Sequence, residues 1–289
     1  MNCDINYNQA RKLMEESVVY HYTSVDTFYN ILSGVKDNKI CLRATHARFM
    51  NDPKEYDYAL SIMKESMIEY EIKNNINDKR KSSYLFEKDS LFPNLSELGG
   101  EPYLLSFSKH SDDLSMWRAY GKDGTGISIG FDSDMLNQYG KENSNTQYLE
   151  CEYEHDKIIS ELIAYWNKEY KNFQMNENNN GTGFNDGNLF FSIPKLCFKA
   201  KSESYIIESE WRLCKNEFNE ENIKFNVKGN LIVPFIEHYF DKNIIKEIFI
   251  GPSANSEQVE RALKIFLSKF GYENLSKSIK RSTISYRSV

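Results

Sequence analysis

Hydrophobic and polar residues alternate along several short stretches of the chain, which is the pattern of half-buried β-strands. Examples are residues 40–45 and 103–108, and the short β-branched and aromatic run at 18–22 also predicts a strand. Further strands are predicted around 125–131, 147–153, 206–214, 223–228, 231–236, 247–250 and 278–286. The strands crowd the last third of the chain, and no regular strand–helix alternation runs through it. We therefore expect an α+β fold with a mostly antiparallel sheet, not a doubly wound parallel sheet.

Apolar residues at helical spacing predict helices between these strands. The first runs from Val25 to Leu32, where Thr23 or Ser24 can cap its start and Gly34 ends it. A much longer helix is expected after Asn51–Glu55, with Pro53 in its first position. Its apolar stripe consists of Tyr56, Ala59, Leu60, Met63, Met67 and Tyr70.

Four more helices are predicted from the same spacing or from their flanking residues. They cover residues 112–120, the stripe from Ile159 to Tyr170, residues 189–201 despite Pro194, and residues 256–270 after a Ser256 cap. Residues 1–17 are expected to be a separate arm or helix. Residues 18–289 are then a single domain, with residues 174–188, almost all Asn, Glu, Gly and Asp, as a flexible surface insertion.

Composition excludes several classes of protein. The 289 residues are 40% hydrophobic and include 19 Tyr and 18 Phe, so a real core can form. A net charge of -6 disfavours broad coating of nucleic acid. The five cysteines are odd in number, contain no C-x-x-C pair and have no clustered histidines, which argues against disulfides or zinc and favours a reducing cytoplasm. No apolar run approaches the roughly 20 residues that span a bilayer, so no membrane association is expected.

Familiar nucleotide-binding and hydrolase motifs are missing from the sequence. The glycine-rich stretch Gly121–Gly126 precedes a predicted strand, whereas a phosphate-binding loop precedes a helix. Gly251–Ser253 does precede a helix, and it is interpreted either as an anion-binding turn or as an ordinary turn.

Other residues have two interpretations when each is taken alone. His21 is either a half-buried structural histidine at a strand end or a functional one. Glu208 and Glu210, at i and i+2 of a predicted strand, would place both carboxylates on one face. Arg212 would share that face, so the residues indicate either a structural Glu210–Arg212 ion pair or a polar cleft.

The sequence contains a series of short motifs, which are Tyr20–Ser24, Ala44–Thr45 with Asn51–Glu55, Ser106–Ser108 with Asp113, Met116–Trp117 and Tyr120–Gly121, Glu208–Arg212, and Ile250–Pro252. Taken together, these motifs resemble an uncharacterised family of bacterial proteins, over most of residues 18–287. More distantly, an early His, a middle Ser-x-Ser and a late Glu-x-Glu resemble the motif order of ADP-ribosyltransferases.

The transferase resemblance implies a split antiparallel sheet with flanking helices, and NAD as the substrate that the site binds. His21 would hydrogen-bond the ribose on the adenosine side. Ser106 would support the pocket and orient the glutamate, with Ser108 beside it.

The resemblance also implies roles for aromatic and acidic residues. Tyr22, Trp117 or Tyr120 would offer an aromatic face to nicotinamide, although Trp117 and Tyr120 are equally interpreted as core residues. Glu210 would hold the ribose 2′-hydroxyl and stabilise the oxocarbenium ion, and Glu208 would orient the acceptor nucleophile. Neither a metal nor a covalent nucleophile is required by this chemistry.

The implied activity is transfer of ADP-ribose from NAD to a macromolecule, either protein or nucleic acid. In a bacterial cytoplasm it would suit a toxin or anti-phage defence effector, with room for an antitoxin or another regulatory partner. Three alternatives stay open: NAD hydrolysis with water as acceptor, an inactive interaction module of the same fold, and a metal-dependent nuclease that uses Glu208, Glu210 and His21.

Overall fold

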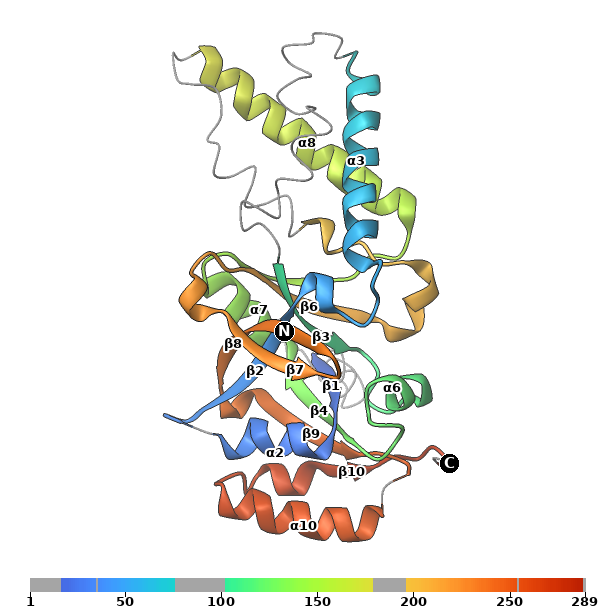
Figure 1. The fold of residues 1–289 in the computed structure, drawn as a ribbon, viewed down its shortest axis with the longest axis vertical. Coiled ribbons are helices and arrows are strands. Elements are labelled where there is room, and N and C mark those ends of the chain that lie inside the picture. Colours follow the sequence, from blue (N-terminus) through green and yellow to red (C-terminus); the bar gives the residue numbers. More distant parts are fainter. Residues whose placement is uncertain (1–16, 35, 76–101, 179–195, 254, 288–289) are drawn as a thin grey trace, which may run out of the picture.

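A computed structural model describes residues 17–34, 36–75, 102–178, 196–253 and 255–287, with side chains left out at 169–178. Its fold is a mixed α+β arrangement around one large sheet (Figure 1). The predicted arm at 1–17 and the predicted insertion near 174–188 lie largely outside the described residues. The strands are β1 (Val18–Thr23), β2 (Lys39–His46), β3 (Pro102–Ser108), β4 (Ile127–Asp132), β5 (Thr146–Glu150), β6 (Glu210–Asn216), β7 (Lys224–Lys228), β8 (Leu231–Asp241), β9 (Ile245–Ile250) and β10 (Ile279–Arg281).

Helices flank this sheet on both faces. The α-helices are α2 (Val25–Ser33), α3 (Glu55–Lys73), α6 (Leu114–Ala119), α7 (Ser133–Glu142), α8 (His155–Asn178) and α10 (Ser256–Lys269). Short 3-10 helices are η1 (Ala47–Phe49), η2 (Glu203–Glu208), η3 (Glu220–Asn222), η4 (Lys242–Ile244) and η5 (Leu275–Ser278).

The sheet is antiparallel except where β10 joins β9 in parallel. Its strand order is β10-β9-β4-β1-β3-β2-β8-β7, while β6 pairs with β3 and β5 pairs with β6. Strands from both ends of the described chain therefore meet in one sheet, which agrees with the mostly antiparallel α+β arrangement expected from the sequence.

The central strand β3 has an unusual edge. On one side it pairs with β6 along its whole length, from Pro102 to Ser108. On the other side it pairs with β1 only at Ser108 and with β2 only at Tyr103 and Leu104. Because β1 and β2 share this edge without pairing with each other, the sheet is split between them. None of the described strands lies beside the middle of β3 on this edge.

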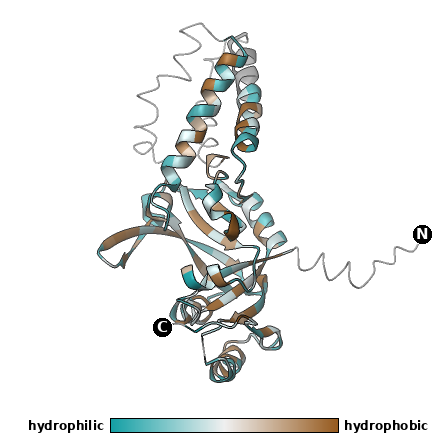
Figure 2. Cartoon of the chain, turned by 90° about the vertical axis from the view of Figure 1, so that its right-hand side faces the viewer, coloured by the Kyte–Doolittle hydropathy of each residue, from teal (hydrophilic) through white to brown (hydrophobic). Residues whose placement is uncertain are grey.

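Each face of the sheet has its own core. On one face, α2, α7 and α10 pack over buried residues of the strands, among them Val19, Leu105 and Phe107. On the other face, α3 and α8 pack over Leu104 and Cys214. Figure 1 shows α3 and α8 standing above the sheet and α2 and α10 below it. Figure 2 shows apolar segments both in the strands and along the two long helices.

Several predicted boundaries are confirmed, and others need correction. Ser24 caps α2 by accepting a hydrogen bond from the Thr27 amide. The long helix α3 begins at Glu55, so the prediction that Pro53 takes its first position is wrong. Residues 51–54 instead form a turn in which Asp52 accepts a hydrogen bond from the Lys54 amide at 2.9 Å.

Two further segments differ from the prediction. Helix α7 was not predicted, although Asp132 caps it by accepting from the Met135 amide. The helix predicted over 189–201 falls partly outside the described residues, and in the described part the chain leaves the helix after Cys197. There it becomes extended, because Ala200 pairs with Glu152.

The glycine-rich stretch 121–126 is explained by close packing. A Cβ at Gly126 would lie 2.2 Å from the Thr23 carbonyl oxygen, and one at Gly251 would lie 2.3 Å from the Gly124 carbonyl oxygen. The Gly251 amide also donates to the Gly126 carbonyl at 3.0 Å. These glycines therefore allow two backbone segments to touch beside β4 and β9.

We expect Gly251→Ala to lower the free energy of unfolding by about 1–3 kcal/mol, because the added methyl group overpacks a backbone contact. Gly229→Asn is the control: Gly229 has a φ of 61° with open space around it, and Asn adopts that conformation readily. Urea unfolding followed by circular dichroism measures both. A Gly251→Ala midpoint equal to that of the wild type would contradict the packing explanation.

Candidate functional site

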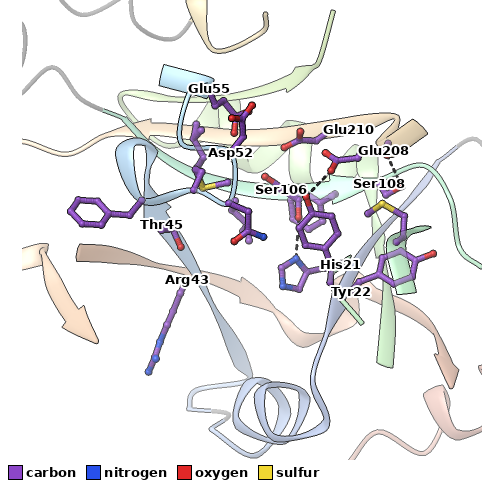
Figure 3. A pocket seen from close by; sticks show the side chains of 18 of the residues that line it. His21, Tyr22, Arg43, Thr45, Asp52, Glu55, Ser106, Ser108, Glu208 and Glu210 are labelled. Atoms are coloured by element: carbon purple, nitrogen blue, oxygen red, sulfur yellow. Dashed lines mark hydrogen bonds between the residues drawn. The ribbon is translucent and has the colours of Figure 1, made fainter. Parts of the chain in front are cut away.

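A cavity of about 380 Å³ opens at the split in the sheet (Figure 3). Its walls come from β1, β2, β3, the turn before α3, α6, the chain around η2, and the β7–β8 hairpin. Seven of the eight predicted site residues line it, and they are His21, Tyr22, Ser106, Ser108, Tyr120, Glu208 and Glu210. The structure thus brings together three motifs that lie far apart in the sequence.

The split explains how these residues can meet. Ser106 and Ser108 pair with Arg212 and Glu210 across β3 and β6, so all four side chains share one face. Tyr20 pairs with Ser108, which places the next residue, His21, on the opposite face. A continuous sheet would separate His21 from the glutamates. Here the gap between β1 and β2 lets one cavity reach both faces.

The His21 ring lies beside the unpaired middle of β3. Its Nδ1 is 3.0 Å from the carbonyl oxygen of Ser106. Burial lowers the pKa of His21, although the Ser106 carbonyl partly opposes this shift. A carbonyl oxygen only accepts hydrogen bonds, so the neutral ring must carry its proton on Nδ1. Nε2 is therefore left as a hydrogen-bond acceptor.

Ser106 also has unused hydrogen-bonding capacity. Its Oγ is buried and has no hydrogen-bond partner within the described residues. Buried hydroxyl groups normally have a partner, because an unsatisfied one costs about 1–3 kcal/mol. Together with His21 Nε2, Ser106 Oγ gives the cavity wall one acceptor and one hydroxyl group that a ligand could satisfy.

Glu210, at the start of β6, is held by two cations. Arg212 donates from Nε to Oε1 at 2.7 Å and from one guanidinium nitrogen to Oε2 at 2.8 Å, and the Lys201 ammonium also contacts Oε2. Burial would raise the pKa of Glu210, but Arg212 and Lys201 outweigh burial and lower this pKa to about 2. The Glu210–Arg212 ion pair expected as the structural alternative is therefore present, and it lies at the cavity.

Glu208 has fewer partners. Its Oε1 accepts a hydrogen bond from the Tyr120 hydroxyl at 2.6 Å, and its Oε2 contacts the same Lys201 ammonium. The Tyr120 pKa is raised by burial and then by its hydrogen bond to Glu208, so the phenol stays protonated and donates. Figure 3 shows the side chains of Glu208 and Glu210 next to each other.

A third carboxylate completes the charged cluster. Glu55, at the start of α3, contacts the Arg212 guanidinium, and Arg212 also donates to the Phe198 carbonyl at 3.1 Å. Burial raises the pKa of Glu55 even though Arg212 opposes the shift. Three carboxylates (Glu55, Glu208 and Glu210) thus face two cations (Lys201 and Arg212), which leaves one net negative charge when all five are ionised.

The local geometry of the Glu-x-Glu motif differs from the prediction. Glu208 ends the 3-10 helix η2, and β6 begins only at Glu210, so the two residues are not i and i+2 of one strand. Ser209 between them has a left-handed conformation with φ of 40°. That conformation is uncommon for a serine and typical of functional or turn positions. The carboxylates converge through this turn and their shared lysine.

The aromatic candidates separate clearly. Trp117 is fully buried, donates from Nε1 to Asp112 at 2.7 Å, and does not line the cavity. The interpretation of Trp117 as a core residue is therefore confirmed. Tyr22 packs edge-on against Trp117 and donates its hydroxyl hydrogen to the His110 carbonyl at 2.8 Å, but it does reach the cavity wall.

Ser108 donates a hydrogen bond to the Glu208 carbonyl at 2.7 Å, which ties β3 to the Glu-x-Glu turn.

Sequence reasoning missed Lys201 and Glu55 as site residues. Lys201 is the last residue of a segment that was predicted to be helical, and Glu55 was treated only as part of a helix start. Glu55 does belong to one of the recognised motifs, Asn51–Glu55, and this was the available signal. Nothing in the local sequence marks Lys201, because its position depends on the pairing of Ala200 with Glu152.

Part of the chain matches a known protein family. Residues 116–213 match a family model described as "Protein of unknown function (DUF2971)". This agrees with the uncharacterised family expected from the motifs, and the matched region runs from α6 through Glu208, Glu210 and Arg212 into β6. No curated protein and no solved structure shows a significant match to the chain.

Two further properties of the structure concern membrane-spanning helices and metal sites. In the described part of the chain, no helix is long and apolar enough to cross a membrane. Among the same residues, no group of three or more His, Cys, Asp or Glu side chains is arranged to hold a metal ion.

We expect Arg212→Met to lower the free energy of unfolding by about 3–5 kcal/mol, because it leaves Glu210 and Glu55 buried without their main cation. The matched control is Lys215→Met on the same strand, where the Lys215–Glu217 pair is partly exposed. That change should cost no more than about 1 kcal/mol. Equal costs in urea unfolding for the two variants would contradict the expected penalty for leaving Glu210 and Glu55 buried without this cation.

Proposed function

We propose that this cavity binds NAD and that the protein transfers ADP-ribose from NAD to a macromolecular acceptor, protein or nucleic acid. The observation that carries the proposal is that His21, Ser106, Glu208 and Glu210 line one cavity. The cavity volume, about 380 Å³, lies in the range of small-molecule sites.

The hydrogen-bonding groups of the wall support a ligand that carries hydroxyl groups. His21 Nε2 can only accept while the ring is neutral, and the Ser106 hydroxyl has no partner in the described chain. The hydroxyls of a ribose would donate to the first and exchange hydrogen bonds with the second. The role of His21 toward a ribose, expected from the resemblance, fits this arrangement.

The charged end of the cavity supports the proposed chemistry. In the reaction the bond between ribose C1′ and the nicotinamide nitrogen breaks, and its electron pair leaves with nicotinamide. The ring departs neutral, so no acid is required, while positive charge develops on the ribose. A fixed negative charge stabilises that charge where water is excluded. The acceptor nucleophile then forms the new bond to C1′ and loses its proton.

The ion pairs of Glu208 and Glu210 suggest different catalytic roles for the two residues from those that the resemblance implies. Two cations already offset the charge of Glu210, which is 4% exposed. Glu208 is 8% exposed and shares a single lysine. We therefore assign Glu208 a direct part in stabilising the oxocarbenium ion, with Glu210 beside it and oriented by Arg212. For the nicotinamide ring, Tyr22 and Tyr120 remain the candidate aromatic partners, because Trp117 lies outside the wall.

The same contacts favour a second candidate function. A carboxylate that is saturated by Arg212 and Lys201 suits a ligand-binding module of this fold that performs no transfer. NAD hydrolysis differs from transfer only in using water as the acceptor. The roles as a toxin or defence effector and the regulatory partner stay predictions.

The transferase activity is tested by incubating the purified protein with NAD labelled in the adenosine part and with cell extract. We expect nicotinamide release and a labelled macromolecule from the wild type, and a loss of about 100-fold or more in Glu208→Gln. Glu203→Gln, on the exposed part of the same 3-10 helix, is the control and should retain activity. Background signal from the wild type would rule out transfer, and NAD binding without turnover in calorimetry would leave the binding module.

NAD binding should depend on the neutral form of His21. We expect calorimetric affinity to stay constant from pH 8 to about pH 6.5 and to fall only at lower pH, because burial lowers the pKa of His21 and protonation turns Nε2 into a donor. His21→Phe should weaken binding by roughly tenfold throughout, for the loss of one hydrogen bond. If His21→Phe binds NAD as tightly as the wild type, the ribose does not contact this ring.

A further inference from the structure

Lys201 lines the cavity and contacts both glutamates of the Glu-x-Glu motif. Its side chain is 6% exposed, and its ammonium contacts Oε2 of Glu208 and Oε2 of Glu210. It also lies 5.1 Å from the centre of the Tyr205 ring and 4.0 Å from Glu55. Among the described cationic side chains, Lys201 is the one that contacts both glutamates of the motif.

Lys201 and Arg212 differ in what they can do. Arg212 is fully buried in β6, is directed to Glu210, Glu55 and a backbone carbonyl, and does not line the cavity. Lys201 does line the cavity. Arg212 therefore holds Glu210 from the protein interior. Lys201 lies between the two carboxylates on the side of the cavity, where a ligand would bind.

The backbone of Lys201 is anchored separately from β6. Its amide donates to the Glu152 carbonyl at 3.0 Å, and the Glu152 amide donates to the Lys199 carbonyl at 2.8 Å. The neighbouring Ala200 is buried. An extended segment that is hydrogen-bonded next to β5 therefore carries Lys201. The position of the Lys201 ammonium does not depend on the two glutamates alone.

Two carboxylates that share a buried site do not both stay ionised without a cation, because their repulsion and desolvation favour uptake of a proton by one of them. Arg212 balances Glu210 but does not contact Glu208. The contact between Lys201 and both carboxylates supplies the missing balance.

We propose that Lys201 is a positioning residue that holds the carboxylates of Glu208 and Glu210 side by side, and thereby sets the lowest pH at which the site works. The effect on activity rests on the proposed function. The effect on the two carboxylates does not, because it concerns the free protein.

The test uses Lys201→Met, which removes the charge at similar length, and Lys201→Arg, which keeps it. The control is Lys199→Met, two residues earlier, whose side chain pairs with Glu161 away from the two glutamates. Carbon-13 NMR of labelled glutamate side chains follows carboxyl titration in the free protein. Nicotinamide release is measured over the same pH range.

In Lys201→Met we expect one carboxyl group of the pair to titrate about 1–3 pH units higher than in the wild type. The acid limb of the activity profile should move with it. Lys201→Arg should restore both, and Lys199→Met should change neither. If Lys201→Met does not fold, Lys201→Gln, which keeps hydrogen-bond donors without the charge, serves in its place.

Two results would overturn the proposal. One is a carboxyl titration in Lys201→Met that matches the wild type. The other is an activity loss of equal size at every pH, which would mark a merely structural lysine. If the wild type turns over no NAD at all, the proposed function fails, and the titration in the free protein still decides the role of Lys201.

Discussion

The split beside β3 is the constraint on which the candidate site depends. One edge of β3 is fully paired with β6, while the other is shared by two strands that separate. A backbone carbonyl left without a strand partner needs another donor, and the His21 ring supplies it to Ser106. The gap gives one cavity access to both faces of the sheet. Without it, His21 and the glutamates would lie on opposite sides of a closed surface.

The buried charges are the second feature that organises the site. Removing charged groups from water is unfavourable unless each finds partners, and ion pairs of this kind are poor sources of net stability. Here Arg212 links β6 to α3 through Glu55, and Lys201 links the chain before η2 to the Glu-x-Glu turn. The cluster therefore fixes the relative position of four segments at one end of the cavity. Charges that are fixed in advance are what stabilisation of a developing cation requires.

Patterns that depend on neighbouring residues were predictable from the sequence. The β-branched and aromatic run around His21, the Ser24 cap and the stripe of α3 all follow local rules, and the strand, the cap and the helix are present in the structure. The pairing of Glu208 with Glu210 was predicted for the wrong reason, because a left-handed Ser209 separates a 3-10 helix from the strand. Lys201 could not be found, since its role arises from a contact between Ala200 and Glu152 that no local rule describes. The conflict between pattern and backbone at Ser209 falls at the candidate site, where such conflicts are expected.

The most direct test of the account is a crystal structure of the protein with a non-cleavable NAD analogue. We expect the nicotinamide-side ribose to lie between Tyr22 and the Glu208–Glu210 pair, with a ligand hydroxyl donating to His21 Nε2 and another beside Ser106. An analogue bound outside the split, or an empty cavity at a saturating analogue concentration, would contradict the claim that this opening in the sheet is a nucleotide site.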